Sequence, residues 1–133
     1  MSNSIITAIT ELDQSRYKTK VFSDGHLIYA DEPEELGGTN EGMAPGALLL
    51  ASLGSCTAIT IRMYADRKEI PLETIKIDLA ICKEEEMSKE TTITRKIEFT
   101  GDITQEQRER LMVIADKCPI HKLLTNPIKI TTT

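Results

Sequence analysis

Apolar residues recur at strand spacing through the first third of the chain. The segments IITAITELD, residues 5–13, and YKTKVFSDGHLIYADEP, residues 17–33, are rich in β-branched and aromatic residues. Ser23-Asp24-Gly25 interrupts the second segment, and Asp-Gly supplies the positive-φ positions that a tight hairpin needs. The pattern therefore predicts three short strands that form a small meander.

A longer apolar run with the character of a helix follows a loop. Gly, Pro, Asn and Thr are concentrated in residues 34–44, and Pro45 suits the first turn of a helix. The run from about Pro45 to about Arg67 has no polar stripe before Arg62. We expect a long buried helix, enclosed by other elements for most of its length, at the centre of the fold.

Alternation of apolar and polar residues returns in the second half of the chain. ETIKIDLAIC, residues 73–82, alternates Ile75, Ile77, Leu79 and Ile81 with polar or small residues, and TTITRKIEFTGD, residues 91–102, does the same with Ile93, Ile97 and Phe99. Both segments are predicted to be half-buried strands. The charged residues between them, 84–90, are expected to form the exposed turn of a hairpin.

The last third of the chain carries helix signals. Thr104 stands three residues before Gln107, which predicts a capping box at the start of an amphipathic helix. We expect this helix to end at Cys118, because Pro119 breaks it there, with one more turn allowed by the residues that follow. Residues 128–133, IKITTT, are predicted to be a closing strand.

The predicted order is β-β-β-α-β-β-α-β. Strands and helices are grouped without regular βαβ alternation, which indicates the α+β class. A chain of 133 residues is long enough for one domain that buries about two thirds of the surface exposed by its unfolded chain. We therefore expect a single domain over residues 1–133.

Charge and composition narrow the range of partners. The formal net charge of −5 gives no electrostatic reason to bind nucleic acid or anionic lipid. The segment MSNSIITAITELDQ lacks the features of a secretory signal, and Arg62 interrupts the apolar run before it reaches the length of a membrane span. A cytoplasmic protein without a membrane segment is predicted.

Three cysteines are the candidate chemical groups. An odd number without an export signal argues against a framework of structural disulfides, so any disulfide is expected to be transient. Cys56 in its apolar helix is either a packed small hydrophobe or a reactive thiol, and sequence pattern alone leaves both open. Cys82 ends a strand with no reactive surroundings and is interpreted as structural. Cys118, in DKCPIHK, stands at a helix break where a side chain can face a cleft.

Other chemistries have weaker support in the sequence. Cys118 and His121 form a C-x-x-H pair, but a structural zinc site needs four ligands and neither of the other cysteines has a second ligand nearby, so no metal is predicted. A Cys–His nucleophile pair with His26 or His121 is formally open. No phosphate-binding glycine loop is present, and no resident cofactor is expected.

Three phrases carry a resemblance to a known family. They are ADEPEELGGTNEG at 30–42, LLLASLGSCTAITIRMYADRK at 48–68 and RLMVIADKCPIHKLL at 110–124. Together they closely resemble the OsmC/Ohr family of osmotically induced and organic hydroperoxide resistance proteins, in the small subgroup whose second motif ends in Cys-Pro-x-His. The resemblance covers most of the chain and agrees with the predicted α+β order.

The resemblance implies a thiol-dependent peroxidase. Cys56 would be the peroxidatic cysteine and Cys118 the resolving cysteine, in an intertwined homodimer with active sites at the subunit interface. A peroxidatic thiol must ionise to attack the O–O bond, and a second thiol then condenses with the sulfenic acid before further oxidation. An external dithiol, in this family often a lipoyl-protein, would reduce the resulting disulfide.

The family pattern also includes a charged pair that this sequence matches only in part. Arg16 is the best match to the family's arginine, which would offset the desolvation of the thiolate, with Lys18 and Lys20 as nearby competitors. The family's glutamate near the start of the long helix is replaced by Gly46 and Ala47. Glutamates in the preceding loop are candidate substitutes from another direction: Glu34, Glu35 and Glu41.

The expected substrate is a small organic hydroperoxide with an apolar tail, because burial of the alkyl part contributes about 25 cal/mol per Å². Met43 and Met63 are candidate lining residues, with core packing as the alternative. A second function remains open. The missing glutamate favours a protein that binds a small apolar ligand, or a thiol redox sensor with little turnover, whereas the two cysteines and Arg16 favour the peroxidase.

Overall fold

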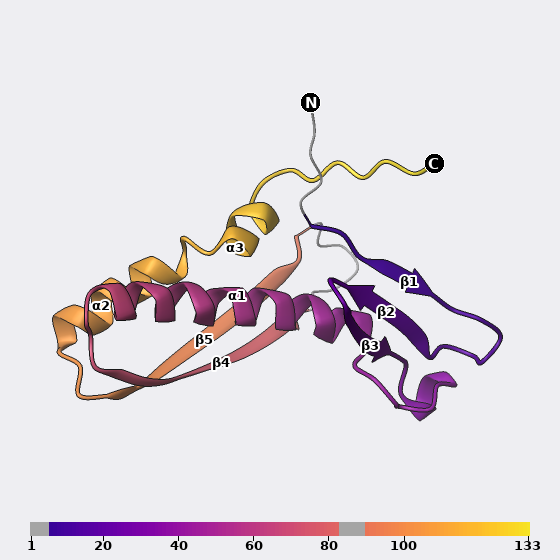
Figure 1. The fold of residues 1–133 in the computed structure, drawn as a ribbon, viewed down its shortest axis with the longest axis horizontal. Helices are drawn as coiled ribbons and strands as arrows, with labels where there is room; N and C mark the ends of the chain where they lie inside the picture. Colours follow the sequence, from indigo (N-terminus) through magenta and orange to yellow (C-terminus); the bar gives the residue numbers. More distant parts are fainter. Residues whose placement is uncertain (1–5, 83–89) are drawn as a thin grey trace. The chain divides into compact units, whose positions relative to one another are not determined.

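The computed structural model describes residues 6–82 and 90–133, which form two sheets and three α-helices (Figure 1). The chain divides into two compact units, Met1–Leu49 and Leu50–Thr133. The architecture is mixed α+β, as predicted. In chain order the elements are β1 (Ile9–Glu11), β2 (Thr19–Ser23), β3 (His26–Ala30), the 3-10 helix η1 (Glu34–Leu36), α1 (Pro45–Arg67), β4 (Leu72–Cys82), β5 (Thr92–Gly101), α2 (Gln105–Ala115) and α3 (Pro119–Leu124).

The first unit contains the predicted meander. β2 pairs antiparallel with both β1 and β3, so the strand order is β1-β2-β3. Ser23 lies opposite His26, and the turn between them holds Asp24 at φ 48° and Gly25 at φ 79°. Both central residues therefore adopt the left-handed conformation that a two-residue hairpin requires. β1 is shorter than predicted, and the start of the predicted strand at residue 5 lies outside the described residues.

Asp31 organises the loop that follows β3. Its buried carboxylate, only 2% exposed, accepts hydrogen bonds from the backbone N–H of Glu32 at 2.7 Å, the Thr39 hydroxyl at 2.8 Å and the backbone N–H of Glu41 at 3.1 Å. Gly38 is required inside this loop, because a Cβ there would lie 2.0 Å from the carbonyl oxygen of Glu32. The Gly-rich motif is thus a carboxylate-centred loop.

The stability of this loop is expected to depend on pH through Asp31. Burial disfavours the charge, but the hydrogen bonds from Glu41, Thr39 and Glu32 outweigh it and place the pKa of Asp31 below its usual 3.8. The ionised carboxylate therefore stabilises the fold above about pH 3.8, and this contribution is lost as the pH falls through the lower pKa of the folded state. Asp31→Asn should lower the melting temperature at neutral pH.

This difference should shrink in acid, where the wild-type carboxyl is also neutral. Thermal unfolding of both proteins between neutral pH and acid pH checks the prediction. Glu35→Gln, at an exposed position of η1, is the matched control and should melt like the wild type. A deficit of Asp31→Asn that stays constant down to the acid limit would contradict the role given to the charge.

Helix α1 has the predicted bounds, but only one of its faces is buried. The buried positions follow helical spacing: Leu53, Gly54, Thr57, Ile61 and Ala65. Ile59 and Met63, on another face, are 54% and 61% exposed. The expected enclosure is therefore limited to one face, against which the described elements of the second unit pack.

The helix α1 is also long and apolar enough to cross a membrane by length and composition, a test that core helices of soluble proteins pass as well. The apolar stretch of α1 passes this length test although Arg62 lies within it, contrary to the expectation from the sequence. The Arg62 guanidinium donates to the carbonyl oxygens of Leu72 and Glu73, both at 2.8 Å, and so binds the start of β4. The absence of a membrane segment and the cytoplasmic location stay predictions.

The second unit is built on the β4–β5 hairpin, whose inward residues pack on α1 and α2. Ile77 lies opposite Ile97, and Ile75 lies opposite Phe99. Gly54 gives the room for this packing, because a Cβ there would lie 2.7 Å from Leu79 Cδ1. The turn predicted at 84–90 falls largely outside the described residues. The buried core of this unit consists of Ile61, Ala65, Leu72, Phe99, Leu111, Ile114 and Ala115.

The capping box of α2 is present as predicted. The backbone N–H of Gln107 donates to the Thr104 hydroxyl at 3.0 Å, and the backbone N–H of Thr104 donates to Gln107 Oε1 at 2.9 Å. The predicted end of this helix at Cys118 is wrong, because α2 ends at Ala115. Cys118 is the N-cap of α3, and Pro119 is the first residue of that helix. An N–H at this position has no partner within the helix, so the missing N–H of proline removes no hydrogen bond.

The predicted closing strand is also wrong. Residues 128–133 have no strand conformation, and Ile130 is 84% exposed. A strand needs an edge with which to exchange backbone hydrogen bonds, and no described strand of this chain pairs with the segment. The prediction of a single domain stays a prediction.

Candidate thiol site

Cys56 lies on the exposed side of α1, next to an open apolar hollow of about 410 Å³. The side chain is half-buried. All residues of this hollow belong to the second unit, and most carry apolar or hydroxyl groups. They are Ser52, Ser55, Cys56, Ile59, Thr60, Met63, Pro119 and Ile120.

Cys118 meets Cys56 from the start of α3. Its thiol is fully buried, and its Sγ accepts the backbone N–H of His121 at 3.4 Å, as an N-cap side chain does. Cys118 lies next to Cys56, because each thiol affects the pKa of the other and the two residues after Cys118, Pro119 and Ile120, line the same hollow as Cys56. The structure therefore brings together the two cysteines that the sequence singled out, and all three cysteines are free thiols.

The two thiols ionise with different ease. Burial raises the pKa of Cys56, and the neighbouring Cys118 thiol raises it further. Burial also opposes the charge on Cys118, but the Cys56 thiol, the His121 N–H and the Thr57 hydroxyl together place the pKa of Cys118 below its usual value. The pKa of the Cys56 thiol is therefore raised and that of the Cys118 thiol is lowered.

Arg95 is a residue of this site that the sequence reasoning missed. Its Nη1 donates to the Thr57 hydroxyl oxygen at 2.9 Å and to the Ala115 carbonyl oxygen at 3.1 Å. Its Nη2 forms an ion pair of 2.7 Å with Asp116 Oδ1. A signal was available, because Arg95 occupies the inward phase of β5 together with Ile93 and Ile97. An arginine on the apolar phase of a strand indicates a buried polar contact.

The cations predicted from the resemblance lie in the first unit. Arg16 has a left-handed backbone with φ 58°, and its guanidinium lies beside Gly37. Lys18 pairs with Glu41 at 3.3 Å and lies over the Tyr29 ring. Lys20 is a residue of β2, paired in register with Tyr29 and Glu11.

The candidate substitutes for the missing glutamate also lie in that unit. Glu41 accepts hydrogen bonds from both Lys18 and Thr39, and these contacts lower the pKa of Glu41. Glu34 and Glu35 form the first turn of η1. Lys18 is therefore the described cation that holds Glu41, and the role of Arg16 stays a prediction.

A metal centre has no candidate ligand group in residues 6–82 and 90–133, where no cluster of three or more His, Cys, Asp or Glu side chains is found. In the C-x-x-H pair, Cys118 and His121 contact each other, and His121 also lies beside Asp116. Cys118 Sγ accepts a hydrogen bond from the backbone N–H of His121, and the His121 imidazole Nε2 lies 3.7 Å from Asp116 Oδ1.

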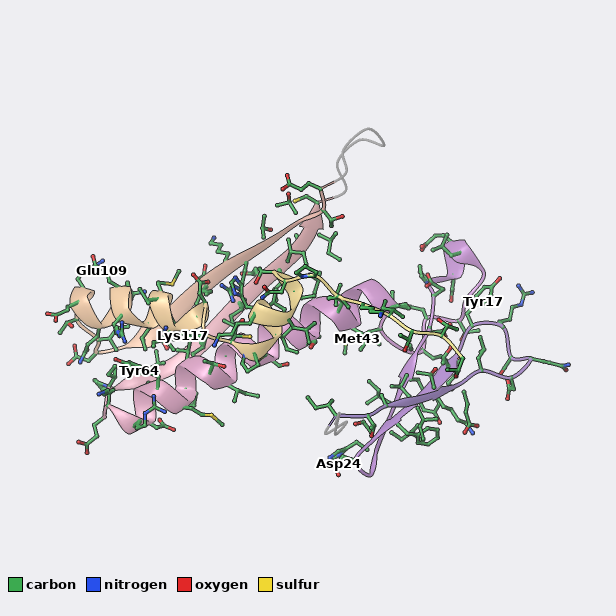
Figure 2. All side chains as sticks on the ribbon, turned by 90° about the horizontal axis from the view of Figure 1, so that it is seen from above. Tyr17, Asp24, Met43, Tyr64, Glu109 and Lys117 are labelled. Carbon is green, nitrogen blue, oxygen red and sulfur yellow. The ribbon has the colours of Figure 1, made fainter. Side chains whose placement is uncertain are left out.

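The two methionines predicted as candidate lining residues lie in different units. Met43 belongs to the first unit and is labelled in Figure 2. Met63, the other candidate lining residue, lies in the hollow beside Cys56.

Comparisons with known proteins identify similar sequences and structures. The family model described as OsmC-like protein matches residues 38–133. Among curated proteins, no match to the sequence was found.

Solved structures share the fold at low sequence identity. A Psychrobacter arcticus protein, proposed to be an osmotic stress induced and detoxification response protein, has 20% identity and a TM-score of 0.76 over 92% of this chain and 90% of its own. An OsmC-like protein of Mycoplasma pneumoniae has 21% identity and a TM-score of 0.72 over 94% and 89%. The organic hydroperoxide resistance protein OsmC of Legionella pneumophila has 22% identity and a TM-score of 0.65 over 93% and 91%.

Proposed function

Because the chain belongs to the OsmC/Ohr family, we propose that it is a thiol-dependent peroxidase that reduces organic hydroperoxides with Cys56 and Cys118. Family membership and the similarity to proteins named organic hydroperoxide resistance proteins support a redox or stress-response role. The observation that supports the finer proposal is the close placement of the two cysteines beside an apolar hollow.

The reaction needs both thiols in sequence. The Cys56 thiolate attacks the terminal oxygen of the hydroperoxide, the O–O bond breaks, and the alkoxide leaves with a proton as an alcohol. Cys56 is then a sulfenic acid. The Cys118 thiolate attacks the Cys56 sulfur and water leaves, which forms the Cys56–Cys118 disulfide. An external dithiol, a lipoyl-protein by analogy with the family, returns both cysteines to thiols while it becomes a disulfide itself.

The neighbouring thiols can share the proton that has to move. The pKa of Cys118 lies below its usual value, and its thiol lies beside that of Cys56. A proton that passes from Cys56 to the Cys118 thiolate leaves the nucleophile charged. Because Cys56 itself is disfavoured as a thiolate by burial, an added cation would increase the populated fraction of this state. Arg16 is our proposed cation. Glu41, the acidic residue that most closely precedes Gly46 and Ala47 in the sequence, is our proposed replacement for the missing carboxylate.

A homodimer fits the exposed apolar face of α1. Leu49, Ile59 and Met63 are each more than 40% exposed in the single chain. Large apolar side chains exposed on one long helix indicate a surface that another chain covers. We propose a second copy of this chain as the partner, as in the intertwined homodimers of the family, with no nucleic acid and no membrane involved.

The alternative function is a protein that binds a small apolar ligand in the hollow, or a redox sensor with little turnover. Gly46 and Ala47 at the position of the usual glutamate favour it. In that case the thiols would still join in a disulfide, but hydroperoxide would be consumed no faster than by a free thiol.

Turnover with a defined reductant tests the proposal. We expect faster consumption of cumene or tert-butyl hydroperoxide than of hydrogen peroxide, with dithiothreitol and then a lipoyl dithiol, because the hollow can bury an alkyl group. Peptide mapping after one equivalent of peroxide should find the Cys56–Cys118 linkage and no linkage to Cys82. Consumption at the rate of a free thiol would leave the ligand-binding or sensing function.

A further inference from the structure

We infer that Arg95 is a positioning residue for the disulfide step: its hydrogen bonds tie the end of α2 to α1 and so hold Cys118 in place beside Cys56. The inference rests on the thiol pairing in the proposed function. It adds a residue of β5 to the site and gives a physical reason why two thiols on different helices stay together.

Arg95 is a buried cation on the apolar phase of its strand. It lies between Ile93 and Ile97 in the alternation of β5, and its side chain is only 14% exposed. Burying a guanidinium is costly unless its N–H groups find acceptors. Three acceptors are present in the second unit. They are Thr57 Oγ1 on α1, the Ala115 carbonyl oxygen at the end of α2, and Asp116 Oδ1.

The contact with α1 is made one residue away from Cys56. Thr57 is fully buried, and its hydroxyl donates to the Leu53 carbonyl oxygen at 2.7 Å. Because a hydroxyl has one hydrogen and two lone pairs, an acceptor position remains for a donor from another element. Arg95 Nη1 donates to this oxygen at 2.9 Å. Arg95 is therefore fixed against the turn of α1 that carries Cys56.

The contact with α2 meets a backbone requirement that the sequence creates. In a continuing helix the Ala115 carbonyl would accept the N–H of the residue four positions later, but that residue is Pro119 and has no N–H. Ala115 is only 1% exposed, so its carbonyl needs a donor from the protein. Arg95 Nη1 donates to it at 3.1 Å. The helix dipole also favours a cation at this end of α2.

The attachment continues from α2 toward Cys118. Asp116 Oδ1 pairs with Arg95 Nη2 at 2.7 Å, and only Lys117 separates Asp116 from Cys118. The connection is tight, because the N–H of Lys117 donates to the Ile114 carbonyl oxygen at 2.9 Å. A shift of the end of α2 relative to α1 would therefore move Cys118 as well.

The position of Cys118 matters because a disulfide tolerates little displacement. The Cα atoms of bonded cysteines lie about 4.4 to 6.8 Å apart. Misplacing a reacting group by about 1 Å can slow a reaction by a factor of about 100. Cys118 is fully buried, and the two residues that follow it, Pro119 and Ile120, line the same hollow as Cys56. Loss of the Arg95 contacts is therefore expected to separate the two sulfur atoms.

Equilibration with glutathione measures how well the two thiols are placed. In Cys82→Ser protein, glutathione disulfide oxidises Cys56 and Cys118 to their disulfide and is itself reduced to two glutathione thiols. The glutathione ratio at half oxidation, determined by mass spectrometry after an acid quench, gives the effective concentration of one thiol for the other. Arg95→Gln should lower this effective concentration by about tenfold or more. Lys96→Gln, the matched control at a side chain that is 74% exposed, should leave it unchanged.

A core variant on the same strand separates positioning from stability. Ile97 occupies the next inward position of β5 and packs against the buried core. Ile97→Val should lower the melting temperature, because it removes a methylene group from that packing, and should leave the effective concentration unchanged. If Ile97→Val lowered the effective concentration as much as Arg95→Gln does, the effect would be one of general stability and the inference would be overturned.

Variants at Thr57 test the contact itself, even if Arg95→Gln does not fold. Thr57→Ser keeps the acceptor oxygen and should keep the wild-type effective concentration, whereas Thr57→Val keeps the shape, removes the acceptor and should lower it. Adding Thr57→Val to Arg95→Gln should cause little further loss, because the two residues act through one contact. Equal values for Thr57→Ser and Thr57→Val would overturn the inference.

Failure of the inference and failure of the proposed function can be told apart. The experiment uses no hydroperoxide, so a protein without peroxidase turnover can still give the expected values. If the wild type formed no Cys56–Cys118 disulfide at any glutathione ratio, the proposed function would fall together with the inference. If the disulfide formed but Arg95→Gln behaved like Lys96→Gln, only the role of Arg95 would be lost.

Discussion

Cys56→Ser is expected to lower kcat/KM for organic hydroperoxides by about a thousandfold or more. A serine hydroxyl at this position stays protonated at neutral pH and is a poor nucleophile toward the O–O bond, whereas the thiol of Cys56 can pass its proton to the neighbouring Cys118. Steady-state consumption of cumene hydroperoxide with a dithiol reductant measures the effect.

Two further cysteine variants make this result specific. Cys82→Ser, at the exposed end of β4, should retain wild-type turnover. Cys118→Ser should consume one equivalent of hydroperoxide and then slow down, because the sulfenic acid on Cys56 has no resolving partner and is open to further oxidation. Turnover by Cys56→Ser at the wild-type rate would sink the peroxidase proposal, and loss of the first equivalent in Cys118→Ser would exchange the roles of the two thiols.

The largest expected loss of stability follows from Leu111→Ala. Leu111 on α2 is fully buried in the core of the second unit, where Ile61 and Phe99 are also buried. Removing its isobutyl group takes away buried apolar area and leaves a cavity that the surrounding strands and helices fill only in part. The free energy of unfolding should fall by about 3 kcal/mol. Urea unfolding followed by far-ultraviolet circular dichroism measures this change.

Met112→Ala is the matched control for the core variant. Met112 is the next residue of α2 and is 43% exposed, so its truncation leaves no cavity and should change the free energy of unfolding by less than about 1 kcal/mol. Equal losses for the two variants would contradict the placement of Leu111 in the core. A change in the denaturant slope as well as the midpoint would indicate that unfolding is not two-state.

The sequence identified those residues of the candidate site that lie within a local motif. Cys56 and Cys118 were selected by the phrases around them, and the structure places their thiols together. Arg95 was not selected, because a single arginine in an alternating strand resembles an ordinary solvated charge until its phase is compared with its neighbours. Its partners Thr57 and Asp116 come from other elements, and no spacing along the chain connects them.

The sequence by itself determined the local elements of this protein. The Asp24-Gly25 turn, the limits of α1 and the capping box of Thr104 and Gln107 all depend on groups only a few residues apart, so short-range sterics and hydrogen bonds decide them. Pro119 was informative too, although it starts α3 and does not end α2. A proline marks a helix boundary without saying on which side the helix lies.

Only the tertiary structure decided which surfaces those elements bury. The composition of α1 allowed burial all round, yet its packing within the chain covers one face, and IKITTT has strand propensity but no described edge to pair with. Burial and strand pairing are interactions between segments far apart along the chain, and their free energy depends on what lies opposite in space. For the same reason, the contact of Arg95 with Thr57 beside Cys118 exists only in the folded second unit.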